Sequence, residues 1–237
     1  MAGAEEKTRS GTAGLRYLSL IAATLAPTSA IAGAWVAPER QQIVTSFAGE
    51  VDGVSFNETS AFIEVPVEPD VSVVGSLWVT NDVQEVPGYR GEVVLGLKQQ
   101  LYQDEDWTIA VQGGALWQSL PPEGCREGGA EIRALAGRSF ENSTFVNAEL
   151  GLRALGTDCL SNRLDLTAGF RPSERWLAMG QIFYDAPHEG QDIARAQVTL
   201  AHFFRSGRGV QIGVRSRIDG GGEELALVVG MWNWGVD

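Results

Sequence analysis

The sequence predicts an all-β fold, an antiparallel up-and-down transmembrane β-barrel of about 12 strands. From about residue 42 to residue 234 the chain repeats one pattern, in which apolar and polar side chains alternate until a turn interrupts them. Val93, Leu95 and Leu97 share one parity, for example, while Glu92 and Lys98 share the other. Successive side chains of a strand point to opposite faces, so each strand has an aliphatic face and a charged face. Long strands of this kind, without helical periodicity, are typical of barrels that cross a membrane.

The first 32 residues have the features of a cleaved secretory signal peptide. Basic residues precede a short apolar run at residues 17–25, and small residues follow it at 28–32. The run is too short to cross a bilayer as a helix, which needs about 20 apolar residues. We therefore expect residues 1–32 to be a signal peptide and residues 33–237 to form an outer-membrane β-barrel.

Twelve segments carry the alternating pattern. We expect strands at residues 41–49, 58–67, 71–80, 90–103, 107–119, 130–140, 144–156, 163–171, 175–186, 193–205, 209–219 and 223–234. Five connections have short, turn-type sequences, such as residues 68–70 and 206–208, and those between them are mostly longer and rich in glycine, proline and acid. Bacterial outer-membrane barrels have short turns at one end and longer loops at the other. An even number of strands then places both termini at the short-turn end.

Cys125 and Cys159 are the two cysteines of the chain, and each falls in a predicted long loop at the same end of the barrel. Exported proteins fold in an oxidising compartment, where an even number of cysteines indicates disulfides. Two free thiols or a metal site are the alternatives, but no histidine or third cysteine lies nearby in the sequence. The sequence therefore predicts a Cys125–Cys159 disulfide and no metal site.

Aromatic residues lie near the ends of the predicted strands. Aromatic side chains are favoured in strands generally, but amphipathic rings also favour the level of the lipid headgroups. We therefore expect two aromatic girdles on the outer surface. The residues concerned are Trp78, Tyr102, Trp107, Trp117, Trp176, Tyr184, Trp232 and Trp234.

The charged parity of the strands defines the predicted lumen, because a charge that faces lipid costs several kcal/mol. A hairpin centred on residues 141–143 places Arg153 across from Glu131, and one centred on Cys159 places Asp165 near Arg153. Asp185 also has the inward parity. The predicted lumen charge network consists of Glu92, Lys98, Glu131, Arg133, Glu149, Arg153, Arg163, Asp165, Arg171, Arg215, Arg217 and Glu224.

Composition and motifs argue against several other functions. The formal charge is −12 and no basic patch with interleaved aromatics occurs, so we expect no nucleic-acid partner. The histidines are His188 and His202. Outer-membrane phospholipases and lipid A deacylases use a histidine followed two residues later by a serine, whereas Phe204 occupies that position here. Without a phosphate loop or a nucleophile elbow either, the sequence predicts no enzyme and no cofactor.

The chain resembles proteobacterial outer-membrane barrels, namely porin-like proteins and the transporter-like proteins of phenol meta-degradation clusters. The resemblance rests on residues 33–35, the alternating strands and the aromatic end of the last strand. The chain departs from this pattern because residues 235–237 follow Trp234, where such barrels end on an aromatic residue. The resemblance implies export to the bacterial outer membrane, contact with its lipid and lipopolysaccharide, assembly by the barrel assembly machinery, and uptake of small solutes.

We therefore predict a narrow channel or binding barrel for small solutes whose identity the sequence does not give. One alternative is a structural or surface-interaction barrel with a closed, salt-bridged lumen. Barrels of about 12 strands lie between the sizes that side chains fill and those that leave a channel, so size does not decide between the two. A more distant alternative is a soluble periplasmic, lipocalin-like barrel, which needs inward aliphatics and outward charges.

Overall fold

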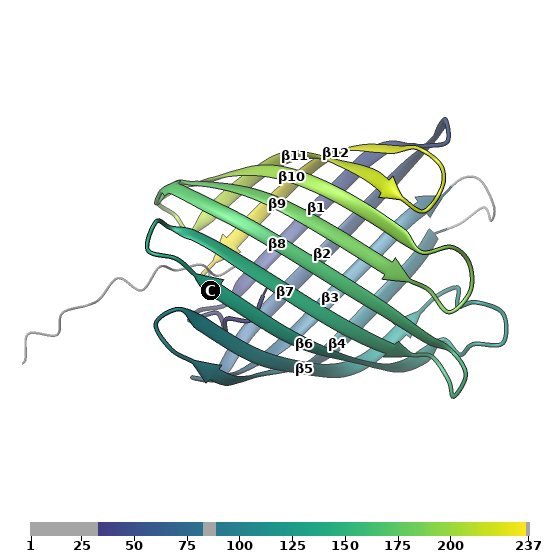
Figure 1. Ribbon diagram of the computed structural model, residues 1–237, viewed down its shortest axis with the longest axis horizontal. Coiled ribbons are helices and arrows are strands. Elements are labelled where there is room, and N and C mark those ends of the chain that lie inside the picture. Colours follow the sequence, from purple (N-terminus) through teal and green to yellow (C-terminus); the bar gives the residue numbers. More distant parts are fainter. Residues whose placement is uncertain (1–32, 83–88, 236–237) are drawn as a thin grey trace, which may run out of the picture.

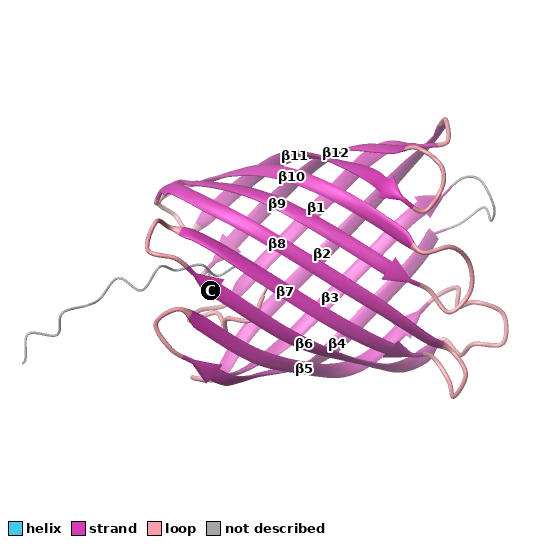
Figure 2. Ribbon diagram, viewed as in Figure 1, coloured by secondary structure: helices cyan, strands magenta, loops and turns pink. Residues whose placement is uncertain are grey.

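The computed structural model describes residues 33–82 and 89–235, and these residues form twelve antiparallel strands and no helix (Figure 1 and Figure 2). Each strand pairs with its neighbours in the sequence, and β1 pairs with β12, so the sheet closes without a free edge. This confirms the predicted up-and-down barrel. The strands are β1 (Gln41–Val51), β2 (Val54–Glu68), β3 (Val71–Asp82), β4 (Tyr89–Gln103), β5 (Trp107–Gln118), β6 (Gly128–Ser139), β7 (Thr144–Ala154), β8 (Leu160–Ser173), β9 (Trp176–Ala186), β10 (Ile193–Phe203), β11 (Arg208–Asp219) and β12 (Glu224–Trp234).

Helical crossing of a membrane and the predicted signal peptide concern different parts of the chain. Within the described residues, no helix has the length and hydrophobicity to cross a membrane. The predicted signal peptide, residues 1–32, lies outside the described residues.

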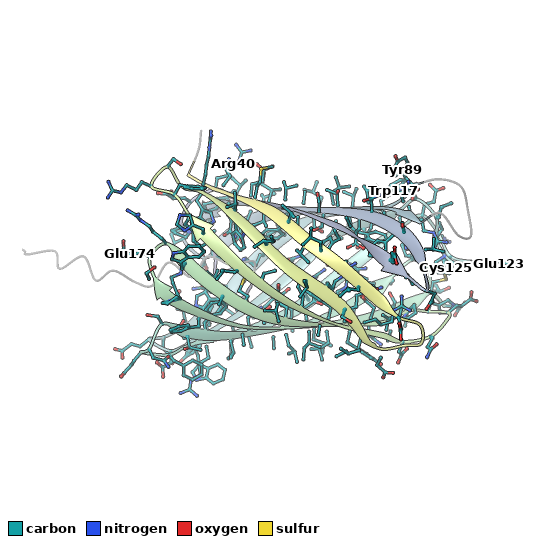
Figure 3. All side chains as sticks on the ribbon, turned by 90° about the horizontal axis from the view of Figure 1, so that it is seen from above. Arg40, Tyr89, Trp117, Glu123, Cys125 and Glu174 are labelled. Atoms are coloured by element: carbon teal, nitrogen blue, oxygen red, sulfur yellow. A yellow bond between two sulfur atoms is a disulfide. The ribbon has the colours of Figure 1, made fainter. Side chains whose placement is uncertain are left out.

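The two ends of the barrel differ in their connections. At one end, which we call the turn end, five connections of two to four residues join β2–β3, β4–β5, β6–β7, β8–β9 and β10–β11. The other end, which we call the loop end, includes longer connections at residues 119–127 and 187–192. Figure 3 places Arg40 and Glu174 at the turn end, and Glu123 and Cys125 at the loop end.

The connection between β1 and β2 corrects one prediction. We expected a loop at residues 50–57, but the two strands continue through it and are joined by Asp52 and Gly53 alone. These residues have φ values of 52° and 79°, which fit the two-residue turns that match the twist of a hairpin. Asp52 also connects the turn to the neighbouring loop, because its carboxylate accepts a hydrogen bond of 2.8 Å from the Glu223 amide.

The two faces of the sheet have opposite character. Aliphatic side chains dominate the outer surface, where Leu95, Val198 and Leu225 are each more than 60% exposed. Charged side chains face the interior, where Lys98 and Glu64 are each 1% exposed. A lipocalin-like barrel needs the reverse arrangement, so the structure does not fit that alternative. An apolar outer face around a charged interior is the polarity of a membrane barrel.

The aromatic residues divide between the two faces. Trp107 and Trp176 near the turn end, and Trp117 near the loop end, are outward and more than 40% exposed, as a girdle requires (Figure 3 labels Trp117). The prediction was wrong for Trp232 and Trp234, which lie inside the barrel, and for Trp78, which shares the inward parity of Ser72 and Val74. Trp232 and Trp234 face inward because the residues that alternate with them in β12 are aliphatic and face outward. These outward residues are Leu225, Leu227, Val229 and Met231.

Candidate functional site

The lumen is the candidate functional site, and its turn end is closed by a cluster of apolar side chains that we call the lumen floor. Three rings form its centre, where Phe203 stacks on Trp234 at 4.6 Å between centroids and meets Trp232 edge to face at 5.7 Å. The Trp232 indole donates a hydrogen bond of 2.8 Å to Gln211. The floor consists of Trp35, Ile43, Phe145, Leu177, Met179, Ala201, Phe203, Trp232 and Trp234.

Glycines on the inner face make room for the floor. A Cβ atom at Gly169 would overlap the ring of Phe145, and one at Gly137 would overlap the ring of Trp35. Trp35 and Phe145 themselves meet edge to face at 6.2 Å between centroids. The rings therefore reach the inner wall only because these positions lack side chains.

Residues 33–38, which we call the N-terminal segment, also lie inside the barrel rather than on its wall. Lys98 of β4 donates hydrogen bonds to the carbonyl oxygens of Gly33 and Trp35 at 3.1 and 2.7 Å. The Ala34 amide donates to the Asn147 side chain of β7 at 3.0 Å. The fully buried Ala34 therefore connects two separated parts of the inner wall.

Glu64 of β2 completes the anchoring of this segment. Its carboxylate accepts hydrogen bonds from the Lys98 ammonium at 2.7 Å, from the Ala37 amide at 3.1 Å and from the Ser72 hydroxyl at 2.7 Å. The buried Lys98–Glu64 pair is thus satisfied by groups of the wall and of the segment together. We did not predict Glu64 as a lumen residue.

Arg153 of β7 is the centre of the first ion-pair cluster. Its Nε donates to Glu131 at 2.5 Å, and its two terminal nitrogens donate to Glu92 at 2.7 and 2.8 Å. Planar guanidinium groups favour this bidentate geometry with a carboxylate. Glu131 lies directly opposite Arg153 in the β6–β7 pairing, which is the register that the 141–143 hairpin predicts.

Arg133 of β6 extends the same cluster towards the middle of the barrel. It contacts Glu131 at 2.6 Å, Glu149 at 3.3 Å and Asp165 at 3.6 Å. The predicted contact between Asp165 and Arg153 was wrong. The β7–β8 hairpin pairs Ala154 with Leu160, so it is centred before Cys159 and places Asp165 opposite Glu149.

The second ion-pair cluster is built around Glu224 of β12. Its carboxylate meets Arg195 and Arg215 at 2.9 Å each and Arg217 at 3.5 Å. Arg215 also contacts Glu58 of β2 at 2.8 Å, and its guanidinium lies 4.1 Å from the ring centroid of Phe47. Arg195 and Glu58 belong to this cluster although we did not predict them as lumen residues.

Asp185 of β9 extends the second cluster to the neighbouring strands. It contacts Arg195 at 3.4 Å and Arg163 of β8 at 2.8 Å. Arg171, which we also predicted in the network, stands apart. Its guanidinium lies 5.3 Å from the ring centroid of Phe203, and within residues 33–82 and 89–235 it forms no ion pair.

The two clusters differ in their balance of charge. The first contains two arginines and four carboxylates, namely Arg133, Arg153, Glu92, Glu131, Glu149 and Asp165. The second contains four arginines and three carboxylates, namely Arg163, Arg195, Arg215, Arg217, Glu58, Asp185 and Glu224. The lumen therefore has an anionic region beside a more cationic one.

Small cavities lie between these groups, and two of them border the ion-pair clusters. One, of about 170 Å³, lies in the middle of the barrel and is lined by residues that include Gly33, Lys98, Arg133, Glu149 and Asp165. The other, of about 130 Å³, opens near the loop end beside Glu92, Arg153 and the disulfide. A water molecule takes up about 30 Å³ in the liquid, so either cavity has room for a few waters or a very small solute.

The structure contains the predicted disulfide between Cys125 and Cys159, which joins the β5–β6 and β7–β8 loops. His188, which is distant in the sequence, has a ring nitrogen within 4.8 Å of both sulfur atoms. The two sulfur atoms are bonded to each other and so present no thiolate to a metal ion. The disulfide instead holds together two of the loops that surround the loop-end cavity.

Comparison with known proteins adds to this description through structure alone. No family model matches the chain, and no curated protein matches it in sequence. Among solved structures it is similar to the KdgM porin (TM-score 0.58, 9% identity, 81% of this chain and 98% of that chain). The chain has the fold of outer-membrane porins. The chain is also similar to the NanC porin (TM-score 0.59, 8% identity, 79% of this chain and 98% of that chain). A further similar structure is the COG4313 outer membrane channel from Pseudomonas putida F1 (TM-score 0.54, 8% identity, 83% of this chain and 95% of that chain).

Proposed function

We propose that the protein is exported, loses residues 1–32 and forms a narrow outer-membrane channel for small polar solutes, which is closed in the described conformation. The apolar outer face with its aromatic rim supports a membrane location. The charged interior supports the passage of polar rather than apolar molecules. On this proposal, outer-membrane lipid and lipopolysaccharide surround the barrel, and the barrel assembly machinery inserts it.

One observation supports a channel best: the lumen is obstructed by a segment that does not belong to the wall. The N-terminal segment pairs with no strand and is held through side chains such as Lys98, Glu64 and Asn147. It can therefore leave the lumen without breaking a hydrogen bond of the barrel ladder. Trp35 would leave with it and open part of the floor.

The ion-pair clusters favour the second candidate, a structural barrel with a permanently closed lumen. Arg153 and Arg215 each bind two carboxylates, and these contacts join side chains of different strands across the interior. Buried pairs of this kind are strongly destabilised when one partner is lost. A barrel of this type would conduct nothing, with or without the N-terminal segment.

The charge pattern restricts the solute. The KdgM porin has been solved in complex with disordered oligogalacturonate, an acidic sugar polymer. In the present chain, arginines of the lumen such as Arg153 and Arg215 are paired with carboxylates, and the first cluster has an excess of acid. We therefore expect small neutral or zwitterionic solutes rather than polyanions.

Single-channel conductance in planar bilayers tests this proposal. The Lys98→Met/Glu64→Gln variant removes the ammonium that holds Gly33 and Trp35 without leaving an unpaired charge. We expect brief, rare openings from the unmodified protein and frequent openings from the variant. Glu141→Gln, in an exposed turn, is the matched control and should behave as the unmodified protein. Silence from all three proteins, with folding verified by heat-modifiable gel mobility, would favour the structural barrel.

A further inference from the structure

We infer that the mid-barrel cavity is a binding site for an ammonium group, and that its ligand is the chain's own N-terminus at Gly33. This inference rests on the proposed removal of residues 1–32 but not on the passage of any solute. The cavity brings Gly33 together with the two carboxylates Glu149 and Asp165.

The position of Gly33 is fixed on both sides of the residue. Its carbonyl oxygen accepts a hydrogen bond from Lys98 at 3.1 Å, and the following amide, of Ala34, donates to the Asn147 side chain at 3.0 Å. The same Asn147 donates its other side-chain group to Glu149 at 3.0 Å. The start of the segment is thus one side chain away from a carboxylate of the first ion-pair cluster.

Glycine is the residue that fits this position. A Cβ atom at residue 33 would lie 3.1 Å from the side-chain carbon and oxygen of Asn147. That distance is tighter than ordinary van der Waals contact, so a larger residue would require Asn147 or the segment to shift by a few tenths of an ångström. Glycine therefore lets the main chain lie close to Asn147, the side chain that donates to Glu149.

Lys98 and Arg133 line the cavity together with Glu149 and Asp165, but among the described residues only Arg133 forms an ion pair with these two acids. The first cluster has two arginines for four carboxylates, and Glu149 and Asp165 share Arg133 through its two longest contacts, 3.3 and 3.6 Å. One oxygen of Asp165 is buried and has no hydrogen-bond partner among the described residues. Buried carboxylate oxygens normally accept hydrogen bonds, and a buried charge normally has a partner.

Removal of the signal peptide would supply a further cation. A peptidase hydrolyses the bond between Ala32 and Gly33 with one water molecule, which leaves a carboxylate on Ala32 and an amino group on Gly33. The amino group takes up a proton at neutral pH, since free α-amines have pKa values of about 7.7–8.0. A neutral amide with one N–H thereby becomes a cation with three N–H donors, which can serve both Glu149 and Asp165.

The consequence is that processing of the precursor fastens the N-terminal segment in the lumen. The α-ammonium would hold the first residue of the segment, while Lys98 and Glu64 hold the residues after it. Before cleavage, the cavity has no equivalent charge to bind. Export and closure of the lumen would then be linked through one peptide bond.

Amine labelling offers a clean test because the processed chain contains few amines. After removal of residues 1–32, Lys98 is the single lysine left in the sequence, so the protein has two amino groups. Reductive methylation of the folded protein at neutral pH, followed by mass spectrometry of the N-terminal peptide, measures the accessibility of the α-amine. We expect labelling at least about tenfold slower than in the denatured chain, because a buried group reacts only through local opening.

Two variants separate the acidic site from burial alone. Glu149→Gln/Asp165→Asn should restore labelling of the α-amine while Lys98 stays protected, and Asp165→Asn alone should have an intermediate effect. The matched control, Glu141→Gln/Glu174→Gln, removes two exposed turn carboxylates and should label as the unmodified protein does. Heat-modifiable gel mobility verifies that each variant is folded.

Three results would overturn the inference. An intact mass that places the N-terminus elsewhere than Gly33 would remove its basis. Fast labelling of the α-amine in the folded, unmodified protein would show that the group does not occupy the cavity. Protection that is unchanged in both acid variants would show that Glu149 and Asp165 do not bind it. A channel that fails to conduct would leave all three measurements unaffected, so this test and that of the proposed function fail separately.

Discussion

The two ends of the lumen are filled by different kinds of contact. At the turn end, apolar rings of the wall pack against Trp35, which belongs to a segment outside the ladder. Nearer the loop end, charged side chains on the strands themselves pair across the interior, as Arg153 pairs with Glu131 and Glu92. On the proposed mechanism, displacement of this segment would open part of the turn end, whereas the paired groups near the loop end belong to the wall itself.

The two regions also differ in what stabilises them. Burial of apolar surface is favourable by itself, at about 25 cal/mol per Å² removed from water. A buried ion pair gains little net free energy, because the desolvation of both charges offsets their attraction, but loss of one partner is costly. Single substitutions should therefore destabilise both regions, whereas removal of Arg153 together with its carboxylate partners should cost the barrel little stability.

Trp232→Ala should give the largest effect, since this ring is 3% exposed at the centre of the floor. Truncation of a buried tryptophan leaves a cavity and costs about 3–5 kcal/mol of unfolding free energy. The Gln211 oxygen that accepts the indole N–H would lose its partner as well. Urea-induced loss of the heat-modifiable band in detergent measures the change. Trp176→Ala removes an outward ring and is the matched control, and an equal loss in both variants would argue against a packed floor.

Arg153→Gln should have a somewhat smaller effect, of about 3 kcal/mol, because it strands two carboxylates in the interior. Addition of Glu92→Gln and Glu131→Gln removes those charges, so the triple variant should recover most of the lost stability. The same urea titration compares the two proteins. The contrary result is a triple variant that is less stable than Arg153→Gln by the summed effects of Glu92→Gln and Glu131→Gln. It would show that the ion pairs themselves stabilise the barrel, against the near cancellation of attraction and desolvation expected here.

How much the sequence predicted depends on how local each feature is. Alternation of side chains has a period of two residues, so it gave the strands and the outward face of β4, β7 and β11 directly. The hairpin at residues 141–143 is short, so its centre fixed the pairing of Glu131 with Arg153. The hairpin that contains Cys159 has a longer loop, and a wrong centre shifted the predicted partner of Asp165.

The features that sequence reasoning missed depend on contacts between distant residues. Ala34 and Asn147 are 113 positions apart in the sequence. The N-terminal segment has no alternating pattern from which its position inside the barrel could be predicted. A tryptophan is compatible with either face of a barrel strand. The outward aliphatic residues that precede Trp232 in β12 determine that Trp232 and Trp234 face inward. Glu58 went unrecognised because we placed it at the edge of a loop that the structure replaces with a two-residue turn.

The most direct test of the central claim, that a movable N-terminal segment closes the lumen, is single-channel conductance of an Ala34→Cys/Asn147→Cys variant before and after reduction in one membrane. The two positions are adjacent, as the 3.0 Å hydrogen bond from the Ala34 amide to the Asn147 side chain shows. The unmodified protein, whose Cys125–Cys159 disulfide meets the same reductant, is the control. We predict silence while the new disulfide holds the segment and frequent openings after reduction. The same current in both states would contradict the claim.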